Sequence, residues 1–328
     1  MRAPMLITAF LVYVSLRQSQ FKQGKLGPCL KWDFWVPSCV PTTMRRRIPS
    51  RPRLSTVCGR SAMSKEKNIH VEFRVPRKPD DVAEMAADLV NRKVDVIATT
   101  GPQPIEAARR ATNTIPIVII ACDRADRLVN SIARPGGNIT GMACISSDLA
   151  LKRLQLMQQV LPGLTHLAVL FNGGVPAKVA ELQDITAAAK TLEVEVHPAD
   201  VRDVSEYTTA FAAIKARKPD GLLILADPLT FQHLKEIAEF AAGQRLPSMY
   251  GFREFCDAGG LLCYGTNLNQ QARRYGYFID KILKGTRPGD IPVEEPTTHD
   301  LIINARTAKL LGLSIPNSIL VSADQVIE

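Results

Sequence analysis

The sequence predicts an α/β protein with two lobes, each built on a parallel sheet flanked by helices. Its 328 residues are enough for two cores of ordinary size. From Asn68 onward, short apolar runs rich in β-branched residues alternate with segments of helical periodicity. Two series of this kind are followed by a late return to strand and helix, which indicates that the chain crosses back between the lobes.

The first series contains two elements whose patterns are especially clear. Val82, Met85, Ala86 and Leu89 recur at helical spacing, and the run 115–120 is apolar throughout, as expected of a strand covered on both faces. The expected elements are strands at 68–75, 94–98, 115–120 and 138–142, with helices at 80–91 and 105–111.

The second series repeats the alternation, which favours right-handed strand–helix–strand units. Its expected strands are 166–171, 193–198, 221–226 and 247–251, and its expected helices are 149–160, 176–191, 204–216 and 229–242. The tail adds strands at 260–265 and 298–304 and helices at 270–284 and 305–311. We therefore expect lobe 1 to comprise 67–145 and 262–287, and lobe 2 to comprise 146–261 and 288–328.

Residues 1–66 form an atypical leader, which we expect to be disordered or a poor signal segment. The apolar run 4–16 follows Arg2 but is too short to span a membrane comfortably, and no small-residue cleavage site follows it. Translation from Met63 is one alternative. Another is that the β-rich part of this run, 6–16, fills a place in the first sheet.

The positive charge of the chain is confined to this leader. Residues 1–65 carry twelve Lys or Arg against Asp33 alone, a net charge of +11 within the overall +9, so the remaining residues carry −2. A nucleic-acid-binding protein needs its basic excess on the folded body. The sequence therefore predicts no nucleic-acid partner.

The sequence offers no metal, cofactor or catalytic motif. Its seven Cys and five His lack zinc-ligand spacing, and we expect small buried thiols and isolated surface imidazoles. Four Cys of the body could form disulfides, but the spacing does not say which. There is no dinucleotide-binding glycine motif, phosphate-binding loop or nucleophile elbow. We therefore expect neither metal nor cofactor, and no enzymatic activity.

Polar residues at the carboxyl ends of the expected strands are the candidate ligand-binding residues, because open α/β sheets bind ligands at these ends. They are Thr99, Thr100, Gly101, Asp123, Asn172, Asp227 and Glu254. Helix amino termini there favour a carboxylate, and Asp227 or Glu254 would complement an ammonium group. The plainer interpretations are that Asp227 before Pro228 is a helix cap, and that Glu254 forms a solvated pair with its neighbour.

The body also resembles a known family, the ABC transporter substrate-binding proteins of the tryptophan/tyrosine type. The most specific matches are ARPGGNITG at 133–141 and GFREF at 251–255, and the resemblance covers roughly 67–328. It implies a periplasmic-binding-protein-like type I fold, with three chain crossings and a small organic solute, often an amino acid, in the cleft. It further implies a permease partner, a periplasmic location, no stable membrane span and no catalysis.

The chain departs from this family pattern in two places. The family's first strand, Ser/Gly-rich loop and helix are not recognisable before Asn68, and Arg124 stands where the family usually has Pro. An alternative is therefore a truncated or mis-started member with little binding activity. An α/β enzyme is a further alternative, and a sugar-responsive regulator would need a helix-turn-helix that residues 1–65 do not show.

Overall fold

The computed structural model describes residues 10–16, 69–74, 81–121, 128–143, 147–296 and 298–328. The strands are β1 (Phe10–Leu16), β2 (Ile69–Arg74), β3 (Val96–Thr100), β4 (Ile117–Ala121), β5 (Ile139–Ala143), β6 (His166–Phe171), β7 (Glu195–Asp200), β8 (Gly221–Ile224), β9 (Ser248–Tyr250), β10 (Leu262–Thr266), β11 (His299–Asn304) and β12 (Gln325–Ile327). The helices are α1 (Asp81–Asn91), α2 (Pro102–Ala111), α3 (Ser147–Val160), α4 (Pro176–Thr191), α5 (Tyr207–Arg217), α6 (Pro228–Gln232), α7 (Leu234–Gly243), α8 (Arg253–Asp257), α9 (Leu268–Leu283), α10 (Ala305–Leu311) and α11 (Asn317–Ser322), with short 3-10 turns η4 (Val204–Glu206) and η5 (Pro288–Asp290).

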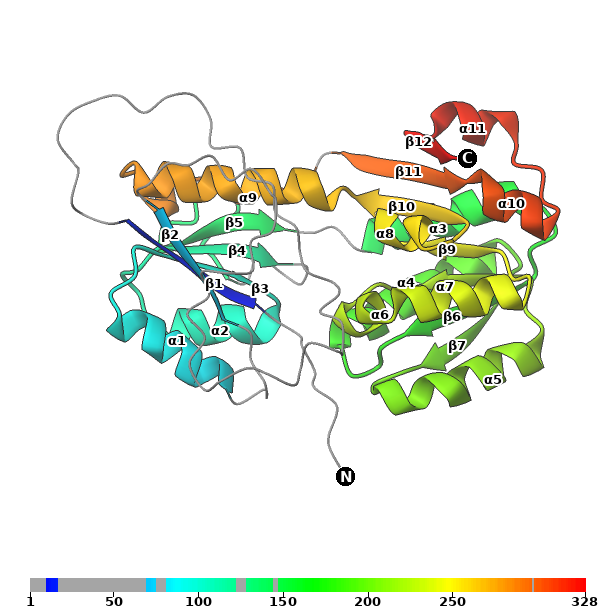
Figure 1. The fold of residues 1–328 in the computed structure, drawn as a ribbon, viewed down its shortest axis with the longest axis horizontal. Coiled ribbons are helices and arrows are strands. Elements are labelled where there is room, and N and C mark those ends of the chain that lie inside the picture. Colours follow the sequence, from blue (N-terminus) through cyan, green and yellow to red (C-terminus); the bar gives the residue numbers. More distant parts are fainter. Residues whose placement is uncertain (1–9, 17–68, 75–80, 122–127, 144–146, 297) are drawn as a thin grey trace, which may run out of the picture.

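These elements form two sheets, each with helices on both faces (Figure 1). The smaller sheet has the order β2-β1-β3-β4-β5, and the larger has the order β12-β11-β10-β9-β8-β6-β7. Strands β3 to β5 are parallel, as are β6 to β10, whereas β11 runs antiparallel to β10. The predicted α/β class with parallel sheets flanked by helices is confirmed.

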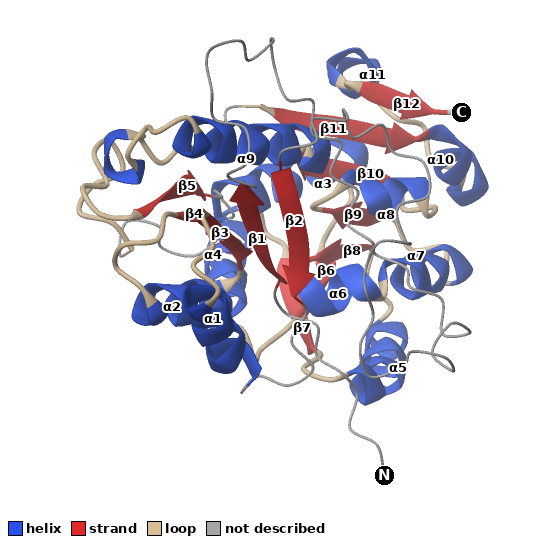
Figure 2. Cartoon of the chain, turned by 60° about the vertical axis from the view of Figure 1, so that its left-hand side comes forward, coloured by secondary structure: helices blue, strands red, loops and turns tan. Residues whose placement is uncertain are grey.

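Alternate side chains along the strands of the smaller sheet pack against helices on its two opposite faces. Ile97, Ile117 and Ile119 face α1 and α2, whereas Val96 and Val118 face the opposite side, where α9 packs. This alternation follows from the two-residue period of a strand. Figure 2 shows α1 and α2 on one side of this sheet and α9 on the other.

Strand β1 lies in the interior of the smaller sheet, between β2 and β3. It pairs antiparallel with β2 through Leu11↔Arg74 to Leu16↔Ile69, and antiparallel with β3 through Phe10↔Thr100 to Val14↔Val96. Residues 10–16 were expected to be disordered or part of a signal segment, whereas the structure places them in the sheet as β1. This agrees with the alternative that the run 6–16 fills a place in this sheet, for the part of that run that the structure describes. The other residues of the expected leader lie outside the described part of the chain.

The chain passes between the sheets three times: from β5 to α3, from β10 to α9, and from the segment after η5 to β11. The two-lobe division stays a prediction. Two of its expected boundaries, however, disagree with the sheet to which the residues beside them belong. Strand β10 belongs to the larger sheet because it pairs with β9 and β11. Residues 291–294 pack on the smaller sheet, where Glu294 exchanges backbone hydrogen bonds with Gly141 and Ala143.

Within the residues that the structure describes, we found no helix of the length and apolar character that a membrane span requires.

Candidate functional site

The carboxyl ends of the parallel strands in the two sheets point toward each other (Figure 1). Thr100 is the last residue of β3, Asn172 directly follows β6, and Asp227 follows β8. Residues that are far apart in the sequence are thereby brought to facing edges of the two sheets. This is the arrangement in which open α/β sheets bind their ligands.

Asn172 and Asp227 form a buried polar pair in the larger lobe. The Asn172 amide Nδ2 donates to Asp227 Oδ2 over 2.7 Å, and the two residues are only 5% and 7% exposed. Asn172 Oδ1 in turn accepts from the Gly174 backbone N–H at 2.9 Å, which fixes the orientation of the amide. The pair couples the ends of two neighbouring strands, β6 and β8.

Asp227 also caps helix α6, as the plainer interpretation held. Its Oδ1 accepts from the Thr230 N–H at 2.8 Å, the Thr230 hydroxyl accepts from the Asp227 N–H at 2.8 Å, and Pro228 occupies the first helical position. This is a capping box. A carboxylate offers about four acceptor sites, and the bonds from Thr230 and Asn172 use two of them. Asp227 therefore combines the cap with remaining capacity to accept.

Glu254 on α8 carries a buried carboxylate oxygen, Oε2, that has no hydrogen-bond partner. Burial raises the pKa of this carboxyl above its ordinary value, and repulsion from Asp257 adds to the rise, while Arg253 opposes it. An unsatisfied buried carboxylate oxygen costs free energy unless a donor or cation reaches it. Glu254 is therefore suited to receive an external donor.

The expected residues of the smaller lobe occupy different depths. The Thr99 side chain is 1% exposed, and its carbonyl oxygen accepts from the Tyr275 hydroxyl of α9 at 3.1 Å. Thr100 is half-buried and its hydroxyl donates to the Ile120 carbonyl oxygen at 3.1 Å, tying the end of β3 to β4. Gly101 has φ of 88° and precedes α2 as its cap, without a side-chain bond. Asp123 lies outside the described residues.

Arg153 is a buried cation at this end of the larger sheet that the sequence reasoning did not single out. Its Nε donates to the Tyr264 carbonyl oxygen at 2.8 Å, and its Nη1 lies 3.6 Å from the buried Glu181 carboxylate. Burial lowers the pKa of this guanidinium, while Glu181 opposes the shift. It lies on the inward face of α3, beside Ala150, Leu154 and Met157.

The Arg153 guanidinium packs against a close approach of two backbone segments. A Cβ at residue 265 would overlap the Gly251 carbonyl oxygen, and side chains at either glycine would crowd Arg153 Nη2. Glycine at both positions lets the ends of β9 and β10 meet. Arg153 thus holds these strand ends in position.

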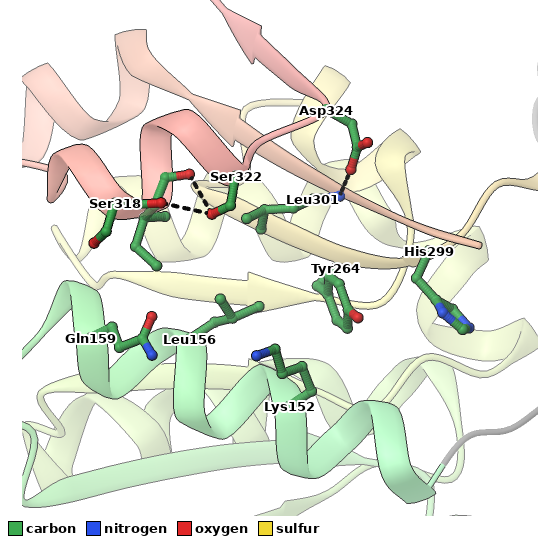
Figure 3. Close-up of a pocket in the computed structure, with 10 residues that line it drawn as sticks. Lys152, Leu156, Gln159, Tyr264, His299, Leu301, Ser318, Ser322 and Asp324 are labelled. Atoms are coloured by element: carbon green, nitrogen blue, oxygen red, sulfur yellow. Dashed lines mark hydrogen bonds between the residues drawn. The ribbon is translucent and has the colours of Figure 1, made fainter. Parts of the chain in front are cut away.

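A pocket of about 210 Å³ lies over the face of the larger sheet between α3 and α11 (Figure 3). Lys152, Tyr264 and His299 are among its lining residues, and none of the candidate ligand-binding residues is. The pKa of His299 is lowered, chiefly because burial desolvates the imidazole and secondarily because the positive charge of Arg153 repels its protonated form. This pocket is therefore separate from the expected site.

Two further side-chain pairs were not resolved by the sequence. Cys256 and Cys263 form a disulfide between α8 and β10. His166 and His197 lie with their ring nitrogens 3.3 Å apart, so the expectation of isolated imidazoles was wrong for these two. Together with Glu195 they form a group that could hold a metal ion.

Comparison with known proteins places these features in a family. The chain is 26% identical over 250 residues to a tyrosine-binding protein of Clostridioides difficile, covering 75% of this chain and 71% of that protein. It is similar to the crystal structure of a conserved domain protein from Vibrio cholerae, with a TM-score of 0.68 and 24% identity. It is equally similar in fold to an ABC domain in complex with L-Trp from Streptococcus pneumonia, with a TM-score of 0.68 and 23% identity. Each of these two matches covers 76% of this chain and 84% of the other.

The two solved structures show the fold, which is the expected periplasmic-binding-protein-like one. The family model described as ABC transporter substrate binding protein matches residues 61–327, which is most of the chain. The resemblance found in the sequence is thereby confirmed, and the chain belongs to the ABC transporter substrate-binding protein family.

Proposed function

We propose that this chain is the extracytoplasmic solute-binding component of an ABC importer and that it binds an amino-acid-like solute between its two lobes. The observation that carries the proposal is the polar set at the facing strand ends. Asn172 and Asp227 contribute a buried amide and carboxylate, and Glu254 adds an unpartnered carboxylate oxygen. The protein binds its solute without converting it, and its partner is the permease of the transporter.

The chemistry of these groups suits a zwitterion. Asp227 and Glu254 are the acceptors for an ammonium group, and the amino terminus of α2 after Gly101, where Gln103 carries a backbone N–H, favours a carboxylate. Thr100 and Gly101 line the smaller lobe's side, with Thr99 as support behind them. Closing the lobes brings both sides onto the solute.

The similarity to a tyrosine-binding protein and to an L-Trp complex supports an aromatic amino acid as the first solute to test. The Cys256–Cys263 disulfide supports an oxidising compartment such as the periplasm, because cytosolic thiols are kept reduced.

The test is thermal unfolding and calorimetric titration with tyrosine, tryptophan and the branched amino acids. A solute at a hundred times its Kd stabilises the folded state by about 2.7 kcal/mol. For a body of this size that corresponds to a rise in Tm of about 5–10 °C. Tyramine, which lacks the carboxylate, and 3-(4-hydroxyphenyl)propionate, which lacks the ammonium, are the matched controls and should bind more weakly. No shift with any amino acid, or equal binding of the controls, would overturn the proposal.

A further inference from the structure

A cluster of three metal-ligating side chains lies at the amino-terminal ends of two neighbouring strands in the larger sheet. His166 begins β6, and Glu195 and His197 lie on the first three residues of β7. One ligand atom from each lies within 4.8 Å of the others. We propose that this cluster is a binding site for a divalent transition-metal ion of the zinc type, with His166 Nδ1, His197 Nε2 and the Glu195 carboxylate as ligands.

The backbone brings these side chains together. Glu195 and His197 are two residues apart on β7, so they project from the same face of the sheet. In the parallel pairing of β6 and β7, His166 lies opposite Glu195, and His197 lies opposite Ala168, two residues further along β6. Neighbouring strands are about 4.8 Å apart, so all three side chains emerge within reach of one point. The convergence is therefore fixed by strand register.

The distances match those of a tetrahedral metal centre. His197 Nε2 and His166 Nδ1 are 3.3 Å apart, and His166 Nδ1 is 3.6 Å from Glu195 Oε2. Ligand bonds of about 2.0–2.1 Å at tetrahedral angles place two ligand nitrogens about 3.3–3.4 Å from each other. Without a metal the same separation is spanned by a hydrogen bond between the two imidazoles, and Glu195 lies beside both rings, with Oε1 3.7 Å from His197 Nδ1.

The strand end that carries His166 is held firmly. Asp220 Oδ2 accepts from the Thr165 N–H, the Thr165 hydroxyl and the His166 N–H, at 2.9, 2.9 and 2.8 Å. The Glu195 N–H donates to the Thr165 carbonyl oxygen at 2.7 Å, joining the starts of β6 and β7. The imidazole planes differ by 17°, so an ion bound by both rings requires rotation about their χ2 torsions. The backbone of the site is thus held in place, whereas the rings adjust when the ion binds.

The donor set selects the class of cation. Imidazole and carboxylate together suit Zn²⁺, Cu²⁺ and Ni²⁺, whereas Mg²⁺ and Ca²⁺ require mostly oxygen ligands. The side chains of His166 and Glu195 are 48% and 64% exposed, so a water molecule can take the fourth position. Three protein ligands with an open fourth position are a common zinc arrangement.

This site is remote from the proposed solute site. His166 and Phe171 stand at opposite ends of β6, about 16 Å apart at the rise of a strand. β7 is the edge strand of its sheet, so a bound ion would fasten this edge to β6. The inference does not depend on the solute, and solute binding should be unchanged by the loss of these ligands.

The experiment is calorimetric titration of the full chain, stripped of metal with a chelator, with Zn²⁺ alone. We expect binding that weakens about tenfold or more in His166→Ala and in His197→Ala, and less in Glu195→Gln. His233→Gln is the matched control, because His233 Nδ1 lies 3.1 Å from Glu236 and forms a two-residue pair without a second imidazole. It should bind Zn²⁺ as the unaltered protein does, whereas Mg²⁺ should give no heat.

A second measurement separates metal binding from folding defects. Zn²⁺ should raise Tm in the unaltered protein and in His233→Gln but not in His166→Ala, while all three unfold in a single transition when no metal is present. Co²⁺ bound at the site should give visible absorption without thiolate charge-transfer bands. The proposal is overturned if His166→Ala/His197→Ala binds Zn²⁺ as tightly as the unaltered protein, or if the stripped protein binds none.

Discussion

Replacing Asp227 by asparagine tests the buried pair at the centre of the proposed site. The new amide side chain would keep the α6 cap, because its carbonyl oxygen can still accept from the Thr230 N–H. Its NH₂ group would then face Asn172 Nδ2, which cannot turn away without losing the bond that Asn172 Oδ1 accepts from the Gly174 N–H. Two donors would face each other at a buried position.

The size of the effect follows from the bond that is lost. A hydrogen bond to a charged group is worth about 1.5–3 kcal/mol, and both partners here are less than a tenth exposed. For a protein of this size we expect Tm to fall by about 3–12 °C. If the carboxylate also receives the solute ammonium, affinity for a confirmed amino acid should fall by about 10–150-fold.

Two variants control this experiment. Asp203→Asn alters an exposed cap of η4, whose carboxylate accepts from Ser205, and asparagine caps helices as well as aspartate does, so Tm should stay close to that of the unaltered protein. In the exchange Asn172→Asp/Asp227→Asn, the amide at residue 227 can donate to the carboxylate at residue 172. This variant should recover most of the stability but not the affinity for the solute. Unchanged Tm in Asp227→Asn would refute the pairing, and unchanged affinity would leave Asp227 as a cap alone.

Two further perturbations address Glu254 and β1. In the folded state burial raises the pKa of Glu254 above its ordinary value of 4.5. The folded state therefore binds the Glu254 proton more tightly than the unfolded chain does. The free energy of unfolding falls as the pH rises from 4.5 through the raised pKa. Glu254→Gln should therefore raise the solute-free Tm at pH 7, with the gain fading near pH 4; a pH-independent difference would contradict this. Val12→Pro removes a backbone donor from an interior strand of the smaller sheet and should lower the free energy of unfolding by about 1–3 kcal/mol, measured with urea. Leaving the urea midpoint where it was would show that β1 is not part of the folded sheet.

Several elements could be read closely from the sequence because their signals are local. The helix expected at 80–91 is α1 (Asp81–Asn91), and the one expected at 149–160 is α3 (Ser147–Val160). Helix α2 begins at Pro102, three residues before the expected start, because Pro is well tolerated in the first helical turn. The short α11 and β12 near the end were not predicted, since a few residues carry too little periodicity.

The sequence predicted the residue types of the candidate site but not the contacts between them. The dipeptide Asp227-Pro228 indicated the cap of α6, which the structure confirms. The bond from Asn172 to Asp227 joins residues 55 positions apart and required the adjacency of β6 and β8. Arg153 was missed because a single Arg on a helical stripe reads as a surface residue until its partners, Tyr264 and Glu181, are in place.

By itself the sequence determined the α/β class, the alternation of its elements, the family and the residue types at the strand ends. These follow from the two- and 3.6-residue periods and from short motifs, which act over a few neighbouring positions. The tertiary structure alone decided that β1 lies between β2 and β3, and that His166 lies beside His197 and the pocket forms beside α11. Such contacts depend on strand order and register, which arise from packing whole faces against one another and leave no mark in the local pattern of the chain.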